Sequence, residues 1–94
     1  MRTAIQVLEE AIQLEAEKKL YITNFSFVFN DVEIQYYGHF YGYAFHVGQS
    51  DEYEFSGNDF CTMLNCFIPL TNKTMREMLN ELTEADLSID TDSF

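Results

Sequence analysis

The chain has 94 residues, of which 47% are hydrophobic and 16% aromatic. This is enough apolar material for one packed core and argues against general disorder. Sixteen acidic residues against five basic ones give a formal net charge of −11 and a pI near 4.2. Such a charge repels nucleic-acid phosphates and anionic membranes but attracts basic protein surfaces. We therefore expect a basic protein as partner, with no direct contact to nucleic acid or membrane.

The first predicted element is a helix over about residues 3–19. Thr3 and Gln6 have the spacing of a capping box, which marks a helix start. The residues that follow place apolar side chains on one face at helical spacing and glutamates mostly on the other. The apolar face includes Ala4, Ile5, Leu8, Ala11 and Ile12.

A strand is predicted over residues 21–30, where side chains alternate with a period of two. Asn30 and Asp31 tolerate left-handed backbone conformations and predict a tight hairpin turn. A second strand with a solvent-exposed outer face is predicted at about residues 32–37. The row of the first strand that is expected to face the core is Tyr21, Thr23, Phe25, Phe27 and Phe29.

A stretch rich in aromatic residues and glycine, at residues 36–45, is predicted to be the central hairpin of the sheet. Gly38 and His39 have the pattern of a type II′ turn. A third strand is expected at about residues 40–47, with a bulge or bend at Gly42.

A short fourth strand is predicted at residues 52–55, with Tyr53 and Phe55 inward, and two helices follow. Capping residues at 56–59 begin the first of these helices, and Pro69 ends it. Both helices have an apolar stripe with the spacing 0, +3, +4, +7. The stripes are Phe60, Met63, Leu64 and Phe67 in the first helix, and Met75, Met78, Leu79 and Leu82 in the second.

Thr74 and Glu77 form a second capping-box candidate, at the start of the last helix. Residues 87–94 are acidic and rich in Ser and Thr, and we expect them to fray. Together these elements predict a single α+β domain over residues 1–94. It consists of a helix, a three- or four-stranded antiparallel β meander, and two helices packed on one sheet face.

The acidic excess is concentrated after residue 50. Residues 51–94 contain ten acidic side chains against Lys73 and Arg76. Glu77 and Glu81 are four residues apart, a spacing at which like charges weaken a helix. We therefore predict a functional acidic face, with a solvated helix flank as the alternative. The acidic residues assigned to partner binding are Asp51, Glu52, Glu54, Asp59, Glu77, Glu81, Glu84 and Asp86.

Tyr37 and Tyr41 are the aromatic candidates for partner contact. Exposed aromatic side chains on a sheet can stack nucleic-acid bases, but such platforms carry Lys and Arg. Residues 21–50 contain neither. The two tyrosines are therefore assigned to a protein interface, where Tyr is enriched. The alternative is that they complete the core with their hydroxyls at its rim.

The sequence contains no recognisable catalytic, metal or cofactor motif. His39 and His46 are seven residues apart and Cys61 and Cys66 five apart, and neither spacing matches a structural zinc site. No basic neighbour favours a thiolate at either cysteine. We therefore expect no enzyme activity, metal or cofactor. Residues 1–20 lack the apolar run of a signal peptide, so we expect a cytoplasmic protein with reduced thiols.

In size, acidity and the order helix, meander, helix, helix, the chain resembles the small phage-encoded anti-CRISPR and other anti-defence inhibitors. The resemblance covers the layout and charge of the whole chain, and these inhibitors share no signature motif. It implies a non-catalytic inhibitor of a nuclease or other nucleic-acid-handling protein. Binding would use carboxylates that mimic phosphates, or aromatic contacts. The alternative is a small acidic chaperone or immunity-type partner that masks one cognate protein. The oligomeric state stays open.

Overall fold

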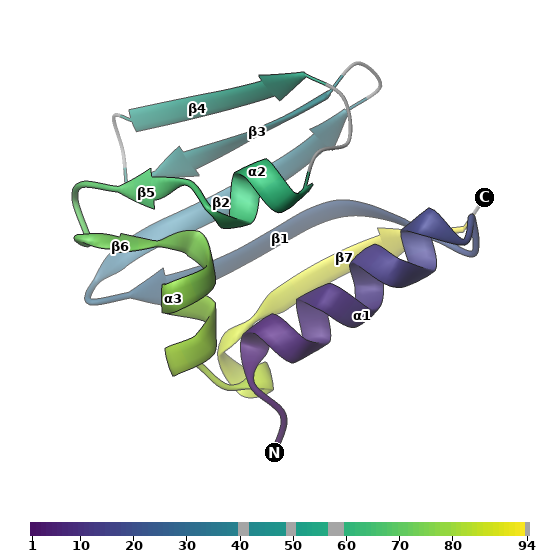
Figure 1. The fold of residues 1–94 in the computed structure, drawn as a ribbon, viewed down its shortest axis with the longest axis horizontal. Coiled ribbons are helices and arrows are strands. Elements are labelled where there is room, and N and C mark those ends of the chain that lie inside the picture. Colours follow the sequence, from purple (N-terminus) through teal and green to yellow (C-terminus); the bar gives the residue numbers. More distant parts are fainter. Residues whose placement is uncertain (40–41, 49–50, 57–59, 94) are drawn as a thin grey trace.

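Figure 1 shows a two-layer molecule, in which the helices lie on one face of a five-stranded antiparallel sheet. The strand order is β4-β3-β2-β1-β7, and β5 and β6 form a separate two-stranded ribbon. The computed structural model describes residues 1–39, 42–48, 51–56 and 60–93, of which 38–39, 42–45 and 51–56 are described by backbone alone. The elements are α1 (Ala4–Ala16), β1 (Tyr21–Phe29), β2 (Val32–His39), β3 (Gly42–Val47), β4 (Asp51–Ser56), α2 (Phe60–Leu64), β5 (Phe67–Ile68), β6 (Lys73–Thr74), α3 (Met75–Glu81), the 3-10 helix η1 (Glu84–Asp86) and β7 (Ser88–Asp92).

The predicted α+β class is confirmed, and the strongest local signals give the right elements. Thr3 caps α1: its hydroxyl accepts a hydrogen bond from the Gln6 N–H at 3.3 Å, and the Gln6 side chain accepts one from the Thr3 N–H at 3.0 Å. Asn30 and Asp31 join β1 to β2 with φ angles of 48° and 64°. These are the left-handed values that a tight hairpin requires.

The second turn of the meander is not where the sequence predicted it. Gly38 and His39 do not form a type II′ turn, because β2 continues through both residues. They pair with Tyr43 and Gly42 of β3, and the register shows no shift that would mark a bulge at Gly42. Residues 40–41, where the third strand was expected to begin, lie outside the described part of the chain.

The core lies between the sheet and the helices and contains the predicted phenylalanine row. At the start of β1, however, Ile22 is buried, whereas Tyr21 is exposed and Thr23 is only half-buried. The pairing of β1 with β7 shifts between Ile22 and Asn24, and such an irregularity reverses which residues face the core. The largest fully buried side chains are Phe25, Leu8, Ile34, Met63, Ile68, Met75, Met78, Leu79 and Val47.

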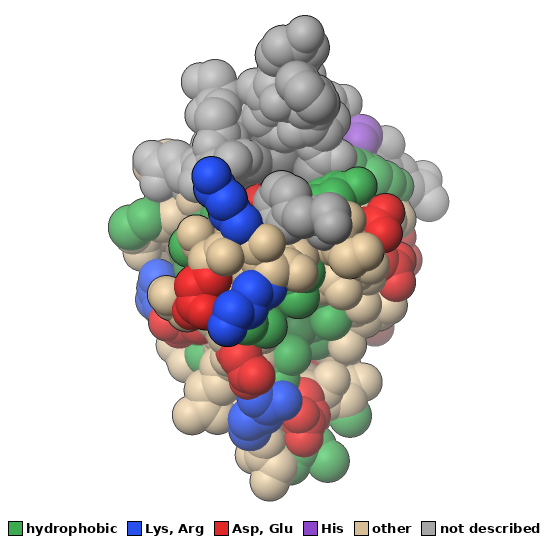
Figure 2. Space-filling view, turned by 90° about the vertical axis from the view of Figure 1, so that its right-hand side faces the viewer, with side chains coloured by type: hydrophobic (Ala, Val, Ile, Leu, Met, Phe, Trp, Pro, Cys, Tyr) green, Lys and Arg blue, Asp and Glu red, His purple; other side chains and the backbone are tan. Residues whose placement is uncertain are grey.

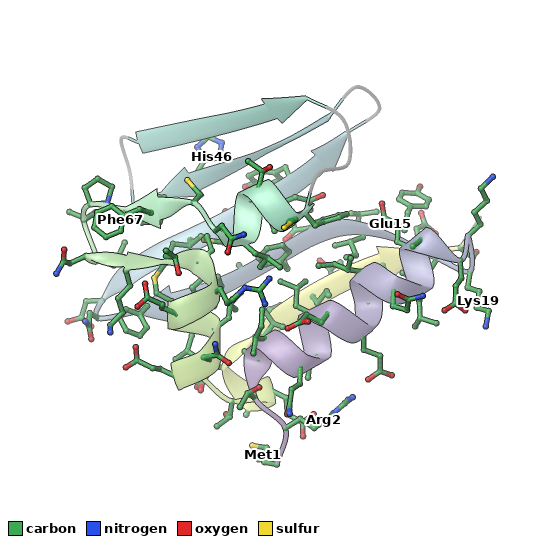
Figure 3. All side chains as sticks on the ribbon, viewed as in Figure 1. Met1, Arg2, Glu15, Lys19, His46 and Phe67 are labelled. Atoms are coloured by element: carbon green, nitrogen blue, oxygen red, sulfur yellow. The ribbon has the colours of Figure 1, made fainter. Side chains whose placement is uncertain are left out.

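The first of the two later helices is much shorter than predicted. Helix α2 ends at Leu64, well before Pro69. Phe67 therefore lies on β5 instead of on a helical stripe (Figure 3). Its exposed fraction is 51%. The buried residue of this segment is Ile68, whose carbonyl accepts a hydrogen bond from the Asn72 N–H at 2.9 Å. This segment therefore forms the β5–β6 hairpin, although its apolar residues have the spacing of a helix.

The C-terminal segment forms a strand and does not fray as predicted. Ser88–Asp92 is β7, which pairs antiparallel with β1 and lies at one edge of the sheet. Within it, Ile89 pairs with Phe25 and packs against the core. The predicted frayed tail at residues 87–94 is therefore wrong for residues 88–92, which the distant strand β1 holds in place.

Candidate functional site: the open face of the sheet

The face of the sheet opposite the helices is exposed, and we call it the open face. Its side chains alternate along each strand with the buried ones, so the strand register identifies them. Most are polar, but Val28 and Tyr37 are 53% and 39% exposed. The described side chains of the open face include Asn24, Ser26, Val28, Glu33, Gln35, Tyr37, His46, Ser88, Asp90 and Asp92.

One row of paired residues crosses the whole sheet through Tyr37. Asn24 of β1 pairs with Tyr37 of β2 on one side and with Asp90 of β7 on the other. Tyr37 also pairs with Ala44 of β3, and Ala44 pairs with Glu54 of β4. The fold thus aligns two residues that the sequence assigned to partner contact, Tyr37 and Glu54, with Asp90, which the sequence did not assign.

Tyr37 is held on the open face by an aromatic contact. Its ring meets the ring of His46 on β3 edge-on, with the centroids 5.5 Å apart and an interplanar angle of 83°. Edge-to-face contacts of this kind are favourable. The Tyr37 side chain stays exposed, so the alternative that it completes the core does not apply. Tyr41, the second aromatic candidate, lies outside the described residues.

The five strands of the sheet contain no Lys or Arg. All five basic residues lie before or after α1, on β6 or on α3, and Figure 3 places Arg2 and Lys19 at opposite ends of α1. Figure 2 shows basic side chains beside acidic ones on one side of the molecule. The ion pairs are Arg2–Glu10, Arg2–Glu84 (3.5 Å), Lys19–Glu17 (3.0 Å), Lys73–Glu81 (2.8 Å) and Arg76–Glu9 (3.3 Å).

Two of the predicted acidic site residues cap helices. The Glu77 carboxylate accepts a hydrogen bond from the Thr74 N–H at 2.9 Å and completes the capping box of α3. This bond lowers the pKa of Glu77 below its usual value. Asp86 accepts hydrogen bonds from the N–H and the hydroxyl of Thr83, at 2.9 and 3.1 Å, at the start of η1. Both carboxylates thus stabilise the fold locally.

Two further acidic candidates lie beside cations. Glu81 pairs with Lys73, and this contact raises the pKa of the Lys73 ammonium. Glu84 pairs with Arg2. All four side chains are partly or largely exposed, so each pair contributes little to stability. The pairs do reduce the local negative charge, so the region around α3 is less acidic than the sequence suggests.

The remaining acidic candidates lie away from α3. Asp51, Glu52 and Glu54 are on β4, which is the predicted fourth strand and one edge of the sheet. The structure describes the backbone of these three residues and not their side chains. Asp59 lies outside the described residues. The structure therefore separates the predicted acidic face into a helical part and a sheet-edge part.

Sequence reasoning missed Asp90 and Asp92 on β7, the opposite edge of the sheet. No described residue donates a hydrogen bond to the Asp90 carboxylate or forms an ion pair with it. The Asp92 carboxylate accepts a hydrogen bond from the Tyr21 hydroxyl at 3.3 Å. The only signal for this strand was the alternation within Ser88–Asp92, and its single apolar residue, Ile89, made that signal weak.

The described residues contain no group of three or more His, Cys, Asp or Glu that could hold a metal ion. Cys61 and Cys66 are free thiols, and burial raises the pKa of the Cys66 thiol. A raised pKa leaves little reactive thiolate at neutral pH. Among the helices of the described ranges, none is long and apolar enough to cross a membrane.

No family model matches the chain, and neither a curated protein nor a solved structure is detectably similar to it. Function is therefore inferred from the charge distribution and geometry of the chain itself. The feature that distinguishes the open face from the helical layer is its lack of cations.

Proposed function

We propose that this protein is a non-catalytic inhibitor that binds a basic nucleic-acid-handling protein, such as a nuclease or a CRISPR effector, in the bacterial cytoplasm. The observation that carries the proposal is the segregation of charge between the two layers. On the helical layer every cation except Lys18 has a described carboxylate partner. The strands of the sheet carry acidic residues and no cation at all.

This segregation favours the sheet over α3 as the contact surface. An ion pair has a weak field beyond its own neighbourhood, because its two opposite charges largely cancel there. Glu33 and Asp90 form no ion pair with any described residue, and their carboxylates leave a net negative field over the open face. A basic groove that normally binds phosphates is complementary to such a field.

The open face offers aromatic as well as acidic contacts. Tyr37 lies in the middle of the row that ends at Asp90, and its contact with His46 restricts the ring. An ordered, exposed Tyr loses little entropy on binding and is a common interface anchor. We therefore place Tyr37 at the centre of the interface, with carboxylates around it pairing with Lys and Arg of the target.

Two variants with equal net charge distinguish the contribution of the sheet to binding from that of the helical layer. The sheet variant combines Glu33→Gln, Asp90→Asn and Asp92→Asn, and the helix variant combines Glu9→Gln, Glu10→Gln and Glu17→Gln. Each removes three negative charges from exposed positions. Immobilised wild-type protein is expected to retain a nucleic-acid-binding protein from bacterial extract at low salt and to release it when DNA is added.

Affinity for the retained protein is then measured at several salt concentrations. The sheet variant is expected to bind at least about tenfold more weakly and with a shallower salt dependence, whereas the helix variant binds nearly as wild type. Equal losses in both variants would mean that net charge alone attracts the target. Failure to retain any protein that DNA displaces would contradict the proposed function. A stable homodimer through the open face would instead favour the chaperone or immunity-type alternative.

A further inference from the structure

The outer edge of β7 is a strand edge that faces away from the sheet. Within the described ranges, β7 pairs with β1 on one side, and no strand pairs with its other side. Four of its five residues are exposed, and Ile89 is half-buried. An edge of this kind can accept a further strand by main-chain hydrogen bonding, a recurrent mode of peptide recognition.

The orientation of the β7 backbone identifies the groups that would receive such a strand. The carbonyl of Asp90 accepts a hydrogen bond from the Thr23 hydroxyl at 3.2 Å, so it points toward β1. Neighbouring residues of a strand direct their backbone groups to opposite sides. The N–H and C=O groups of Ile89 and Thr91 therefore point away from β1, toward the free edge.

The charge on β7 restricts what can occupy this edge. Asp90 and Asp92 are two residues apart, so their carboxylates lie on the same face of the strand, about 7 Å apart. Neither forms an ion pair with a described residue. A second copy of the chain would place β7 or the acidic strand β4 beside these carboxylates, and like charges opposed across a strand pair are destabilising.

We propose that β7 is a docking edge for an extended basic segment of the partner protein, which adds to the sheet as a sixth strand. Lys or Arg side chains at alternate positions of that segment pair with Asp90 and Asp92, and its backbone bonds to Ile89 and Thr91. This inference rests on the proposed function, since it takes the partner to be basic. To that function it adds which part of the partner makes the contact, an extended segment, and that backbone hydrogen bonds contribute to its recognition.

A peptide of alternating Lys and Thr tests the edge even before the partner is identified. Added to the isotopically labelled chain, it is expected to shift the amide resonances of β7 and to slow hydrogen exchange at Ile89 and Thr91. A control peptide of the same charge has Pro in place of Thr, and its backbone cannot pair as a strand. Equal shifts at β7 with both peptides, or larger shifts at β4 or the helices, would overturn the proposal.

Two substitutions test the main-chain and charge contacts separately. Thr91→Pro removes an outward N–H but no hydrogen bond to β1, and Thr91→Val is its control because it keeps the N–H. We expect Thr91→Pro to weaken peptide binding at least about tenfold, with Thr91→Val close to wild type. Asp90→Asn is expected to weaken binding, whereas Asp31→Asn, which removes the same charge from the exposed β1–β2 turn, is not.

The spectrum of each free variant shows directly whether the fold is retained. Should Thr91→Pro disturb it, the pair Asp90→Asn and Asp31→Asn still decides the question, because equal effects in these two would contradict docking at β7. A failure of docking at β7 can be distinguished from a failure of the proposed inhibitor function. If the protein retained from extract is lost with Tyr37→Ser but kept with Thr91→Pro, the inhibitor function stands and docking at β7 is wrong.

Discussion

Asp90 pairs with Asn24, and this pairing brings the acidic C-terminal segment onto the same sheet as the aromatic strand β2. Without β7, the edge of β1 would be uncovered, and the open face would end at Asn24. The pairing therefore has a structural role, because it covers β1. In the proposed complex it also serves recognition, because it places the Asp90 carboxylate, which has no ion-pair partner among the described residues, at the rim of an exposed sheet.

The first prediction concerns the stabilising role of β7. Ile89→Ala is expected to lower the free energy of unfolding by about 1 kcal/mol, because a half-buried aliphatic side chain that packs on the core is truncated. Urea unfolding followed by circular dichroism measures the loss. Asp90→Asn, at an exposed neighbouring position, should leave the unfolding midpoint nearly unchanged. A frayed segment would give the same midpoint for both variants and wild type.

β7 shows why part of the fold could not be predicted from sequence. The capping boxes at Thr3 and Thr74 and the turn at Asn30 depend on neighbouring residues, and all three were predicted correctly. The strand at Ser88–Asp92 has weak intrinsic preference and forms because β1 offers a pairing edge from far away in the sequence. Strand preference depends strongly on such context.

The candidate site, like the fold, could be predicted from the sequence only in part. The sequence identified the acidic excess and Tyr37, and the structure places Tyr37 on an exposed face. It could not show that Glu84 would meet Arg2, because that ion pair joins opposite ends of the described chain. It could not show that the Asp90 carboxylate would face solvent with no ion-pair partner in the described part of the chain, because its segment was expected to fray. Charge counts along a sequence do not reveal which charges are paired in space.

The second prediction tests the corrected placement of the β5–β6 hairpin. Ile68→Ala is expected to cost about 2–4 kcal/mol in the free energy of unfolding, because Ile68 is fully buried. Phe67→Ser should cost less, on the order of 1 kcal/mol, because about half of Phe67 is already in water. Chemical unfolding of both variants measures the contrast. A larger cost for Phe67→Ser would support the longer helical stripe that the sequence predicted.

The third prediction concerns the two thiols. Cys61 is exposed, whereas Cys66 is half-buried and desolvation raises its pKa. Because the thiolate is the reactive form, iodoacetamide should alkylate Cys61 faster than Cys66 near neutral pH. Mass spectrometry of Cys61→Ser and Cys66→Ser gives the rate at the remaining thiol in each case. In denaturant the two rates should become similar, so a difference that persists there would have a cause other than burial.

The fourth prediction follows from the lowered pKa of Glu77. Its carboxylate accepts a hydrogen bond from the Thr74 N–H, so the folded pKa lies below the usual 4.5. The ionised form is thus favoured by folding, and its contribution to stability is present above pH 4.5 and lost as the pH falls through the folded pKa. Glu77→Gln keeps an acceptor oxygen but does not titrate. Wild type should be more stable than this variant at neutral pH, and the difference should shrink as the pH falls below 4.5. Urea unfolding of both proteins over this pH range measures the difference. A difference that stays constant with pH would show that the Glu77 charge has no part in capping α3.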